Sequence, residues 1–157
     1  MMAIHDPISI LMVDDDPDDR LLVADAFEAN RMTGRLRFAE DGQGLMDYLN
    51  QRGRYHDPDR FPRPDLILLD LNMPGMDGRE ALAEIKNDPR FRAIPIVVLT
   101  TSSQESDIRQ TYDLGANSYI VKPMRFSDLV QAIGSLGSYW FEMVKLPQRA
   151  AGHPARH

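Results

Sequence analysis

The chain of 157 residues is long enough for one domain with one sizeable core, and its 43% hydrophobic content is ordinary for a globular protein. Its net charge of −6 argues against non-specific binding to nucleic acid or to an anionic membrane surface. The absence of cysteine excludes disulfides, zinc thiolates and cysteine nucleophiles. No secretory signal and no long apolar run is visible, so we expect a cytoplasmic protein that does not span a membrane.

The first predicted strand covers residues 8–13 and is followed by an acidic run, Asp14-Asp15-Asp16-Pro17-Asp18-Asp19. Asp16 is placed to cap a helix whose first turn holds Asp18 and Asp19, near the positive end of the helix dipole. Capping does not require the first two carboxylates of the run, which directly follow the strand. Those two are therefore candidates for a functional role.

Four further apolar segments alternate with helical patterns. They predict strands over residues 36–39, 66–69, 94–99 and 118–121. Ser102 and Glu105 fit a capping box that would open the fourth helix, and the last helix is expected from about residue 127 to 144. The alternation predicts an α/β fold, a doubly wound five-stranded parallel sheet with five helices and the flavodoxin-like order 2-1-3-4-5.

We expect one domain over residues 6–146 with an extended last helix. Residues 147–157 show no periodicity and are predicted to be a disordered tail. That segment is too short for a DNA-binding or enzymatic output domain, so we expect a single-domain protein.

Asp70 directly follows a uniformly apolar segment, residues 66–69, that is typical of a strand buried on both faces of a parallel sheet. Open α/β sheets bind ligands at the carboxyl ends of their strands. The other strands that end in chemically capable side chains contribute Asp14 and Asp15, Thr100, and Lys122. A single such residue is most simply a cap, but four strand ends of this kind on one rim predict a site.

Three carboxylates in one cleft repel each other, by roughly 4 kcal/mol for a pair 4 Å apart at an effective dielectric of about 20. Lys122 supplies one positive charge, and a divalent cation would supply two more. Ligands that are all oxygen, without histidine or cysteine, favour Mg²⁺.

An aspartate is already ionised at neutral pH, because its unperturbed pKa is about 3.9. It can therefore act as a nucleophile without a general base and form an aspartyl phosphate. Mg²⁺ and Lys122 would offset the charge of the phosphoryl oxygens, and Thr100 could donate a hydrogen bond to the product. The residues alone thus suggest phosphoryl transfer onto Asp70.

Four motifs carry a resemblance to a known family: Val-Asp-Asp at 13–15, Leu-Asp-Leu-Asn-Met-Pro-Gly-Met-Asp-Gly at 69–78, Leu-Thr at 99–100 and Tyr-Ile-Val-Lys-Pro at 119–123. Over about residues 8 to 137 the chain resembles the receiver domain of two-component response regulators. The resemblance implies a signalling protein rather than an enzyme, with Asp70 accepting a phosphoryl group from a sensor histidine kinase.

The resemblance also implies the metal ligands: Asp15, Asp70 and the backbone carbonyl of Asn72 bind Mg²⁺, and Asp14 acts mainly through water. Lys122 pairs with the acyl phosphate, and its peptide bond to the following proline is expected to be cis.

By the same resemblance, Thr100 and Tyr119 form a switch pair. Thr100 moves toward the phosphoryl group, the Tyr119 ring rotates into the space left, and the surface of helix 4, strand 5 and helix 5 changes. Asn72 and Ser102 occupy positions that tune dephosphorylation. Thr101 stands where the family usually has a smaller residue, so it narrows access to the phosphoryl group.

The proline-rich loop at residues 52–64 and the Tyr-Trp-Phe…Leu-Pro segment resemble the small response regulators of bacterial phytochromes, which implies a kinase of phytochrome type. Apolar residues in the last helix lie beyond the expected core: Trp140, Phe141, Met143 and Val144. If exposed, they form a patch that favours a homodimer; the alternative is that the extension packs on its own domain.

Three other functions are alternatives to a phosphorylated receiver. A phosphatase of haloacid-dehalogenase type also uses a strand-end aspartate and Mg²⁺, but it requires a second aspartate two residues later, where this chain has Asn72. A pseudo-receiver that only binds partners would lack site residues that are present here. A flavodoxin would need a phosphate-binding loop after the first strand.

Overall fold

The computed structural model describes residues 8–32 and 36–143. Its strands form one parallel sheet in the order β2-β1-β3-β4-β5, which confirms the predicted flavodoxin-like topology. The strands are β1 (Ile10–Val13), β2 (Leu36–Ala39), β3 (Leu66–Leu69), β4 (Ile96–Thr100) and β5 (Ser118–Val121).

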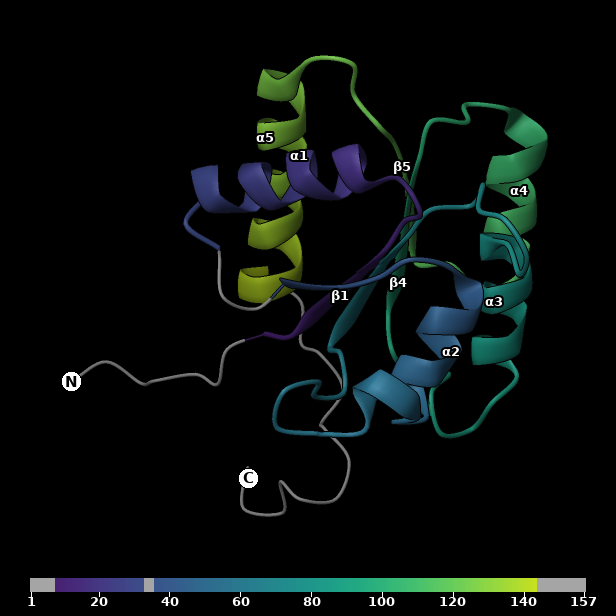
Figure 1. Ribbon diagram of the computed structural model, residues 1–157. Helices are drawn as coiled ribbons and strands as arrows, with labels where there is room; N and C mark the ends of the chain where they lie inside the picture. The colour runs from purple at the N-terminus through teal and green to yellow at the C-terminus, as the bar shows by residue number, and fades with distance from the viewer. Residues whose placement is uncertain (1–7, 33–35, 144–157) are drawn as a thin grey trace.

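The helices cover both faces of the sheet. Figure 1 shows α1 and α5 on one face, with α2, α3 and α4 on the other. Their bounds are α1 (Pro17–Ala29), α2 (Gly42–Leu49), α3 (Gly78–Lys86), α4 (Glu105–Asp113) and α5 (Phe126–Gly137). A 3₁₀ turn, η1 (Gly53–Tyr55), follows α2, and a π-helical segment, η2 (Ser138–Met143), directly continues α5.

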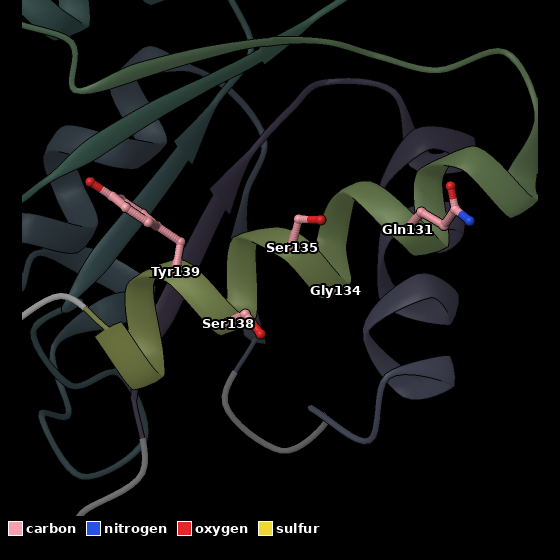
Figure 2. Close-up of a pocket in the computed structure, with 5 residues that line it drawn as sticks. All are labelled: Gln131, Gly134, Ser135, Ser138 and Tyr139. Carbon is pink, nitrogen blue, oxygen red and sulfur yellow. The ribbon is translucent and has the colours of Figure 1, made fainter.

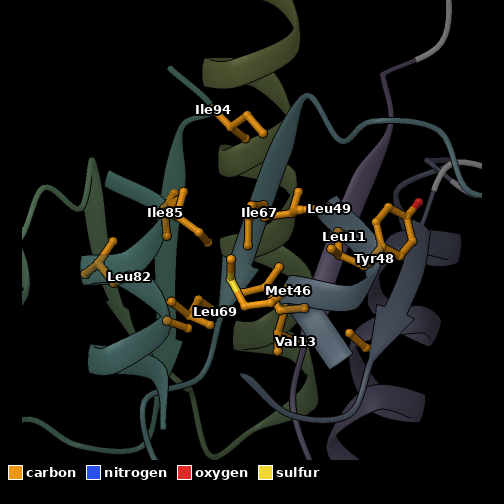
Figure 3. Close-up of a cluster of buried hydrophobic side chains, with 14 of the residues drawn as sticks. Leu11, Val13, Met46, Tyr48, Leu49, Ile67, Leu69, Leu82, Ile85 and Ile94 are labelled. Atoms are coloured by element: carbon orange, nitrogen blue, oxygen red, sulfur yellow. The ribbon is translucent and has the colours of Figure 1, made fainter. Parts of the chain in front are cut away.

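Alternate strand residues enter two separate cores. On the side of α2 and α3, the strands contribute side chains such as Leu11, Val13, Ile67 and Leu69 (Figure 3). Their neighbours in sequence, such as Ile10, Met12, Leu66 and Leu68, pack on the side of α1 and α5. Because successive strand residues point to opposite faces and both faces are covered, the strands read as continuous apolar runs.

Two strands are shorter than predicted. β4 begins at Ile96 rather than at residue 94, because Pro95 has no amide hydrogen to donate to a strand ladder. β1 begins at Ile10 rather than at residue 8, since the amide of Ser9 is engaged by the side chain of Asp65 at 2.9 Å.

The predicted capping box at α4 is wrong. The helix begins at Glu105, and Gln104 stands at its N-cap without a capping side-chain hydrogen bond. The Ser102 hydroxyl instead donates to the Asp107 carboxylate at 2.6 Å. At α1 the prediction is confirmed, because the Asp16 side chain accepts the backbone amide of Asp18 at 2.9 Å.

An aromatic cluster anchors the long loop before β3. The Tyr48 ring in α2 packs against Tyr55 and Phe61, with ring centroids 5.1 and 5.8 Å away. The Tyr48 hydroxyl donates to the carbonyl oxygen of Pro62 at 3.0 Å. This loop is therefore attached to the α2 side of the sheet through one buried tyrosine.

The expected exposed patch on the last helix is wrong for Trp140. That side chain is only 7% exposed and belongs to the core cluster that also contains Phe27 of α1. Its indole is used for packing within the domain, which is the alternative that the sequence left open. The side chains of Phe141 and Met143, as well as Val144 and the tail at 147–157, lie outside what the structure describes. None of the described helices is long and apolar enough to cross a membrane.

Candidate functional site

The carboxyl ends of β1 and β3 bring three carboxylates together. One oxygen each of Asp14, Asp15 and Asp70 lies within 4.8 Å of the other two. Asp14 is fully buried and Asp70 is 8% exposed, whereas Asp15 is exposed. This is the cluster predicted from the strand ends, and it sits where adjacent parallel strands β1 and β3 end side by side.

Local backbone contacts hold Asp70 in place. Its amide donates to the carbonyl of Val13 in β1 at 3.0 Å, and the Gly78 amide donates to the carbonyl of Leu71 at 2.9 Å. A Cβ at Gly78 would lie 2.3 Å from the Asp70 carbonyl oxygen and 2.7 Å from the Leu71 Cα. Only glycine lets the start of α3 approach the Asp70 backbone this closely.

The Lys122 ammonium lies among three carboxylates rather than beside one partner. Its Nζ donates to Asp14 Oδ2 at 2.6 Å and to Asp19 Oδ2 at 2.8 Å, and it lies 3.6 Å from Asp70 Oδ2. From the sequence, Asp19 is expected only to interact with the helix dipole, so its contact with Lys122 was not predicted. The one sequence feature that could have indicated this contact is that Asp19 lies in the first turn of α1, which starts at the same edge of the sheet where Lys122 lies.

The pKa values of the two buried groups follow from this geometry. Burial raises the pKa of the Asp14 carboxyl, and the hydrogen bonds from Lys122 and from the Asp16 amide only partly oppose that effect. Burial by itself lowers the pKa of Lys122, but its hydrogen bonds to Asp14 and Asp19 and the charge of Asp70 outweigh burial and raise it. Lys122 therefore stays positively charged at neutral pH.

The donor set fits a hard divalent cation. Asp14, Asp15 and Asp70 offer only oxygen, which is the ligand type that Mg²⁺ takes in proteins. The Asn72 amide lies 3.5 Å from Asp70 Oδ1, so the loop after β3 turns back toward the Asp70 carboxylate. The role of the Asn72 carbonyl as a metal ligand stays a prediction.

Thr100 ends β4 with a hydroxyl that has no partner. Its side chain is fully buried, and its Oγ1 makes no hydrogen bond to any of the described residues. A buried hydroxyl without a partner costs about 1–3 kcal/mol. The group is thus ready to donate to an oxygen placed at the rim beside Asp70.

Tyr119 is partly buried against the core on the α2 and α3 side, and its hydroxyl donates to the carbonyl of Ser102 at 2.8 Å. The structure gives no contact between Tyr119 and Thr100, so their action as a switch pair stays a prediction. The expected cis bond between Lys122 and Pro123 is wrong, because every peptide bond in the described segments is trans. The trans form is the intrinsically favoured one, and Lys122 reaches both of its carboxylate partners from it.

A groove of about 580 Å³ lies apart from this cluster, along α5 and the start of η2 (Figure 2). It is lined by Gln131, Gly134, Ser135, Ser138 and Tyr139. None of these residues belongs to the carboxylate and lysine cluster, so the groove is not the site of the chemistry.

Relatives with similar sequences are response regulators and a regulatory protein. Response regulator Rcp1 of Synechocystis sp. is 43% identical over 141 residues, which cover 90% of this chain and 94% of Rcp1. The probable methanogenesis regulatory protein FilR2 of Methanothrix harundinacea is 39% identical over 147 residues, which cover 94% of this chain and 92% of FilR2.

Solved structures give the same result. The phosphorylated cyanobacterial phytochrome response regulator RcpA matches with a TM-score of 0.82 and 42% identity, over 90% of this chain and 99% of that one. The Mn²⁺-bound form of Rcp1 matches with a TM-score of 0.80 and 42% identity, over 90% of this chain and all of that one. Residues 10–134 match the family model of the response regulator receiver domain. The chain therefore belongs to the response regulator receiver family of two-component signalling.

Proposed function

We propose that this protein accepts a phosphoryl group on Asp70 from a sensor histidine kinase and that the phosphorylated form switches the surface made by α4, β5 and α5. The observation that carries the proposal is the Lys122 ammonium, which lies 3.6 Å from the Asp70 carboxylate inside the cluster of Asp14 and Asp15. Helix capping does not explain why a lysine from the end of β5 and three carboxylates from the ends of β1 and β3 converge on one point.

In the proposed transfer, an Asp70 carboxylate oxygen forms a bond to phosphorus while the bond from phosphorus to the kinase histidine nitrogen breaks. The electron pair returns to the imidazole nitrogen, so Asp70 needs no general base. Lys122 pairs with the transferred phosphoryl oxygens. Mg²⁺, held by Asp15, Asp70 and the Asn72 carbonyl with Asp14 acting through water, would supply positive charge to the same oxygens. The Mn²⁺-bound form of Rcp1 supports a divalent cation at this site.

After transfer, the free Thr100 hydroxyl donates to a phosphoryl oxygen and satisfies its own unmet hydrogen bond. As it does so, Thr100 moves toward Asp70. The Tyr119 hydroxyl gives up its hydrogen bond to the Ser102 carbonyl, and the Tyr119 ring rotates into the space that Thr100 leaves. Asn72 and Ser102, which flank the acceptor and the switch threonine, tune how long the phosphoryl group lasts. Thr101 narrows access to it.

The kinase in this proposal is of phytochrome type and acts in the cytoplasm. Support comes from RcpA, which is described as a phytochrome response regulator and shares 42% of its residues with this chain over most of both proteins. FilR2 is described as a probable methanogenesis regulator, so a kinase of another type is the alternative that a transfer assay must exclude.

The test is incubation with acetyl phosphate and Mg²⁺, followed by intact-mass measurement. Wild type should gain the mass of one phosphoryl group, and Asp70→Asn should gain none. Asp25→Asn, which removes an exposed carboxylate from α1, is the control and should behave as wild type. Equal phosphorylation of the Asp70→Asn protein would refute the assignment. Sustained hydrolysis of a generic phosphoester would favour the phosphatase instead, and no uptake by wild type would favour a pseudo-receiver.

We also propose that the protein forms a homodimer through the last helix. With Trp140 buried, the exposed side chain that supports this proposal is Tyr139, which is 51% exposed beside the groove on α5. Light scattering over a concentration series should detect a dimer that Tyr139→Ala weakens. A monomer at high micromolar concentration would count against it.

A further inference from the structure

Lys122 is held by two carboxylates from two different elements. Asp14 at the end of β1 accepts one hydrogen bond from its Nζ at 2.6 Å, and Asp19 in the first turn of α1 accepts another at 2.8 Å. An ammonium group has three N–H donors. Asp70 Oδ2, at 3.6 Å, is too far for a direct hydrogen bond, so the third donor is not used by that carboxylate.

We propose that Asp19 is a positioning residue, which fixes the Lys122 ammonium beside Asp70 so that its third N–H meets the incoming phosphoryl oxygen; this inference rests on the proposed function. A phosphoryl group on Asp70 extends beyond the carboxylate and places its oxygens nearer to Nζ than Oδ2 is now. Lys122 can then bind the phosphoryl group without releasing Asp14 or Asp19.

The need for a second anchor follows from the side chain of Lys122. A lysine carries its charge on a flexible four-carbon stem, and one contact leaves the ammonium free to rotate about it. Asp14 is also committed elsewhere, since its Oδ1 accepts the Asp16 amide at 3.0 Å. Asp19 provides the second fixed point, and the side chain of Lys122 is accordingly only 11% exposed.

Asp19 lies in α1, a helix that is packed firmly against the core. The residues of α1 that follow it, Val23, Ala26 and Phe27, are buried in the core shared with α5. The contact between Asp19 and Lys122 therefore ties α1 to the segment between β5 and α5. Groups held by packed elements stay within the narrow geometry that phosphoryl transfer requires.

The simpler role for Asp19 is interaction with the positive end of the helix dipole. Asp18 allows the two roles to be separated, because it occupies the same first turn and carries the same charge. The Asp18 side chain is exposed, and within the described part of the chain Lys122 forms its ion pairs with Asp14, Asp19 and Asp70 instead. Asp18→Asn therefore removes one carboxylate that interacts with the helix dipole in the same way, and it leaves the contacts between Asp19 and Lys122 intact.

The experiment measures phosphorylation rates with acetyl phosphate and Mg²⁺ for wild type, Asp19→Asn, Asp19→Glu and Asp18→Asn. Loss of one charge-assisted hydrogen bond to Lys122 should slow Asp19→Asn by about tenfold. Asp19→Glu restores a carboxylate and should recover most of the rate, and Asp18→Asn should stay near wild type. In a Lys122→Ala background, Asp19→Asn should have little further effect.

A second readout does not depend on phosphorylation. The reactivity of the Lys122 amine is measured by competitive acetylation with acetic anhydride and peptide mass spectrometry, and it should rise in Asp19→Asn but not in Asp18→Asn. Thermal unfolding of each variant identifies any loss of folding. Equal rates in Asp19→Asn and Asp18→Asn, or an undiminished effect of Asp19→Asn without Lys122, would overturn the positioning role. If wild type takes up no phosphoryl group although Lys122 shows the expected change in reactivity, the proposed function fails and the role of Asp19 in phosphoryl transfer falls with it.

Discussion

The Tyr119 hydroxyl donates a hydrogen bond to the backbone carbonyl of Ser102 at 2.8 Å, which ties β5 to the loop that precedes α4. The Ser102 hydroxyl continues the connection to Asp107 in α4 at 2.6 Å, and Asp107 accepts from Arg79 in α3 at 2.7 Å. The loop that follows Thr100 is therefore held from both sides. Any movement of Thr100 toward a phosphoryl group acts on this connected set.

Replacing Tyr119 by phenylalanine removes the hydroxyl and keeps the ring. Because one hydrogen bond is lost, we expect the free energy of unfolding to fall by about 1 kcal/mol. Backbone amides at residues 101–104 should exchange hydrogen faster, since the loop loses one of its two attachments. Urea denaturation and hydrogen exchange measure the two effects. Tyr112→Phe is the control, because Tyr112 is 47% exposed. Unchanged exchange in the loop would show that the hydrogen bond does not hold it.

Asp15→Asn should separate two effects of the carboxylate cluster: the loss of stability caused by charge repulsion and the stabilisation gained when Mg²⁺ binds. Without divalent cations the variant should melt a few degrees higher than wild type, because one carboxylate near Asp14 and Asp70 is neutralised. Mg²⁺ at about a hundred times its dissociation constant should stabilise wild type by about 2.7 kcal/mol and be much less effective on the variant. Thermal melts with EDTA and with Mg²⁺ test this. Asp25→Asn should respond to Mg²⁺ as wild type does, and an equal response of Asp15→Asn would remove Asp15 from the metal site.

The alkaline stability of the protein should depend on Tyr48. Burial is the main cause that raises the pKa of Tyr48 from its ordinary value of 10.0 to about 12. The folded state therefore keeps the phenol proton longer than the unfolded state does. The stabilisation is fully present below pH 10 and is lost as the pH rises toward about 12, by up to about 2–3 kcal/mol.

The corresponding variant is Tyr48→Phe, which should lose less stability than wild type between pH 10 and pH 12. Burial also raises the pKa of Tyr55, so some decline should remain in the variant. Urea midpoints across this pH range measure the slope. Tyr112→Phe again serves as the exposed control, and a slope in Tyr48→Phe as steep as in wild type would contradict the prediction.

Gly78→Ala should damage the site through the backbone of Asp70, the proposed phosphoryl acceptor. The added Cβ meets the Asp70 carbonyl oxygen at 2.3 Å and the Leu71 Cα at 2.7 Å, so the loop must move. We expect a loss of about 1–3 kcal/mol in stability and slower phosphorylation of Asp70.

Gly134→Ala is the matched comparison for that substitution. Its Cβ would meet the Asn30 Oδ1 at 2.7 Å, and Asn30 can turn away only by losing the hydrogen bonds that its Nδ2 donates to the carbonyls of Ala26 and Val130. The variant should therefore lose stability as well, but it should leave the phosphorylation rate unchanged, because the contact does not involve the backbone of Asp70. Thermal melts and acetyl phosphate kinetics test both variants, and equal effects would mean that the close approach at Gly78 does not matter.

The sequence by itself determined the layers of the fold and the convergence of three carboxylates at one edge of the sheet. Uniformly apolar strands such as Leu66–Leu69 predicted a parallel sheet covered on both faces, and the structure has that sheet in the predicted order. Asp14, Asp15 and Asp70 were predicted to converge because each follows a strand, and parallel strands end on one edge. These inferences depend only on local patterns and on the regular geometry of sheets.

Helix ends and the last helix were harder to predict. The capping box expected at Ser102 does not form, because the Ser102 hydroxyl donates to Asp107 instead. Asp107 also accepts a hydrogen bond from Arg79 of α3, so a tertiary contact holds it there. The apolar spacing of the last helix did not reveal which side chains α1 covers, and the structure buries Trp140 in the core that contains Phe27. Periodicity describes one element and says nothing about its neighbour.

The partner of Lys122 was decided only by the tertiary structure. Asp19 lies 103 residues before Lys122, and in the sequence it is one acid among several at a helix start. Its carboxylate reaches the ammonium because buried residues of α1 pack against α5. This packing places the start of α1 beside Lys122, which directly follows β5. Local sequence patterns specify the elements and the chemistry at their ends, whereas the placement of α1 relative to β5 follows from side-chain packing across the whole domain.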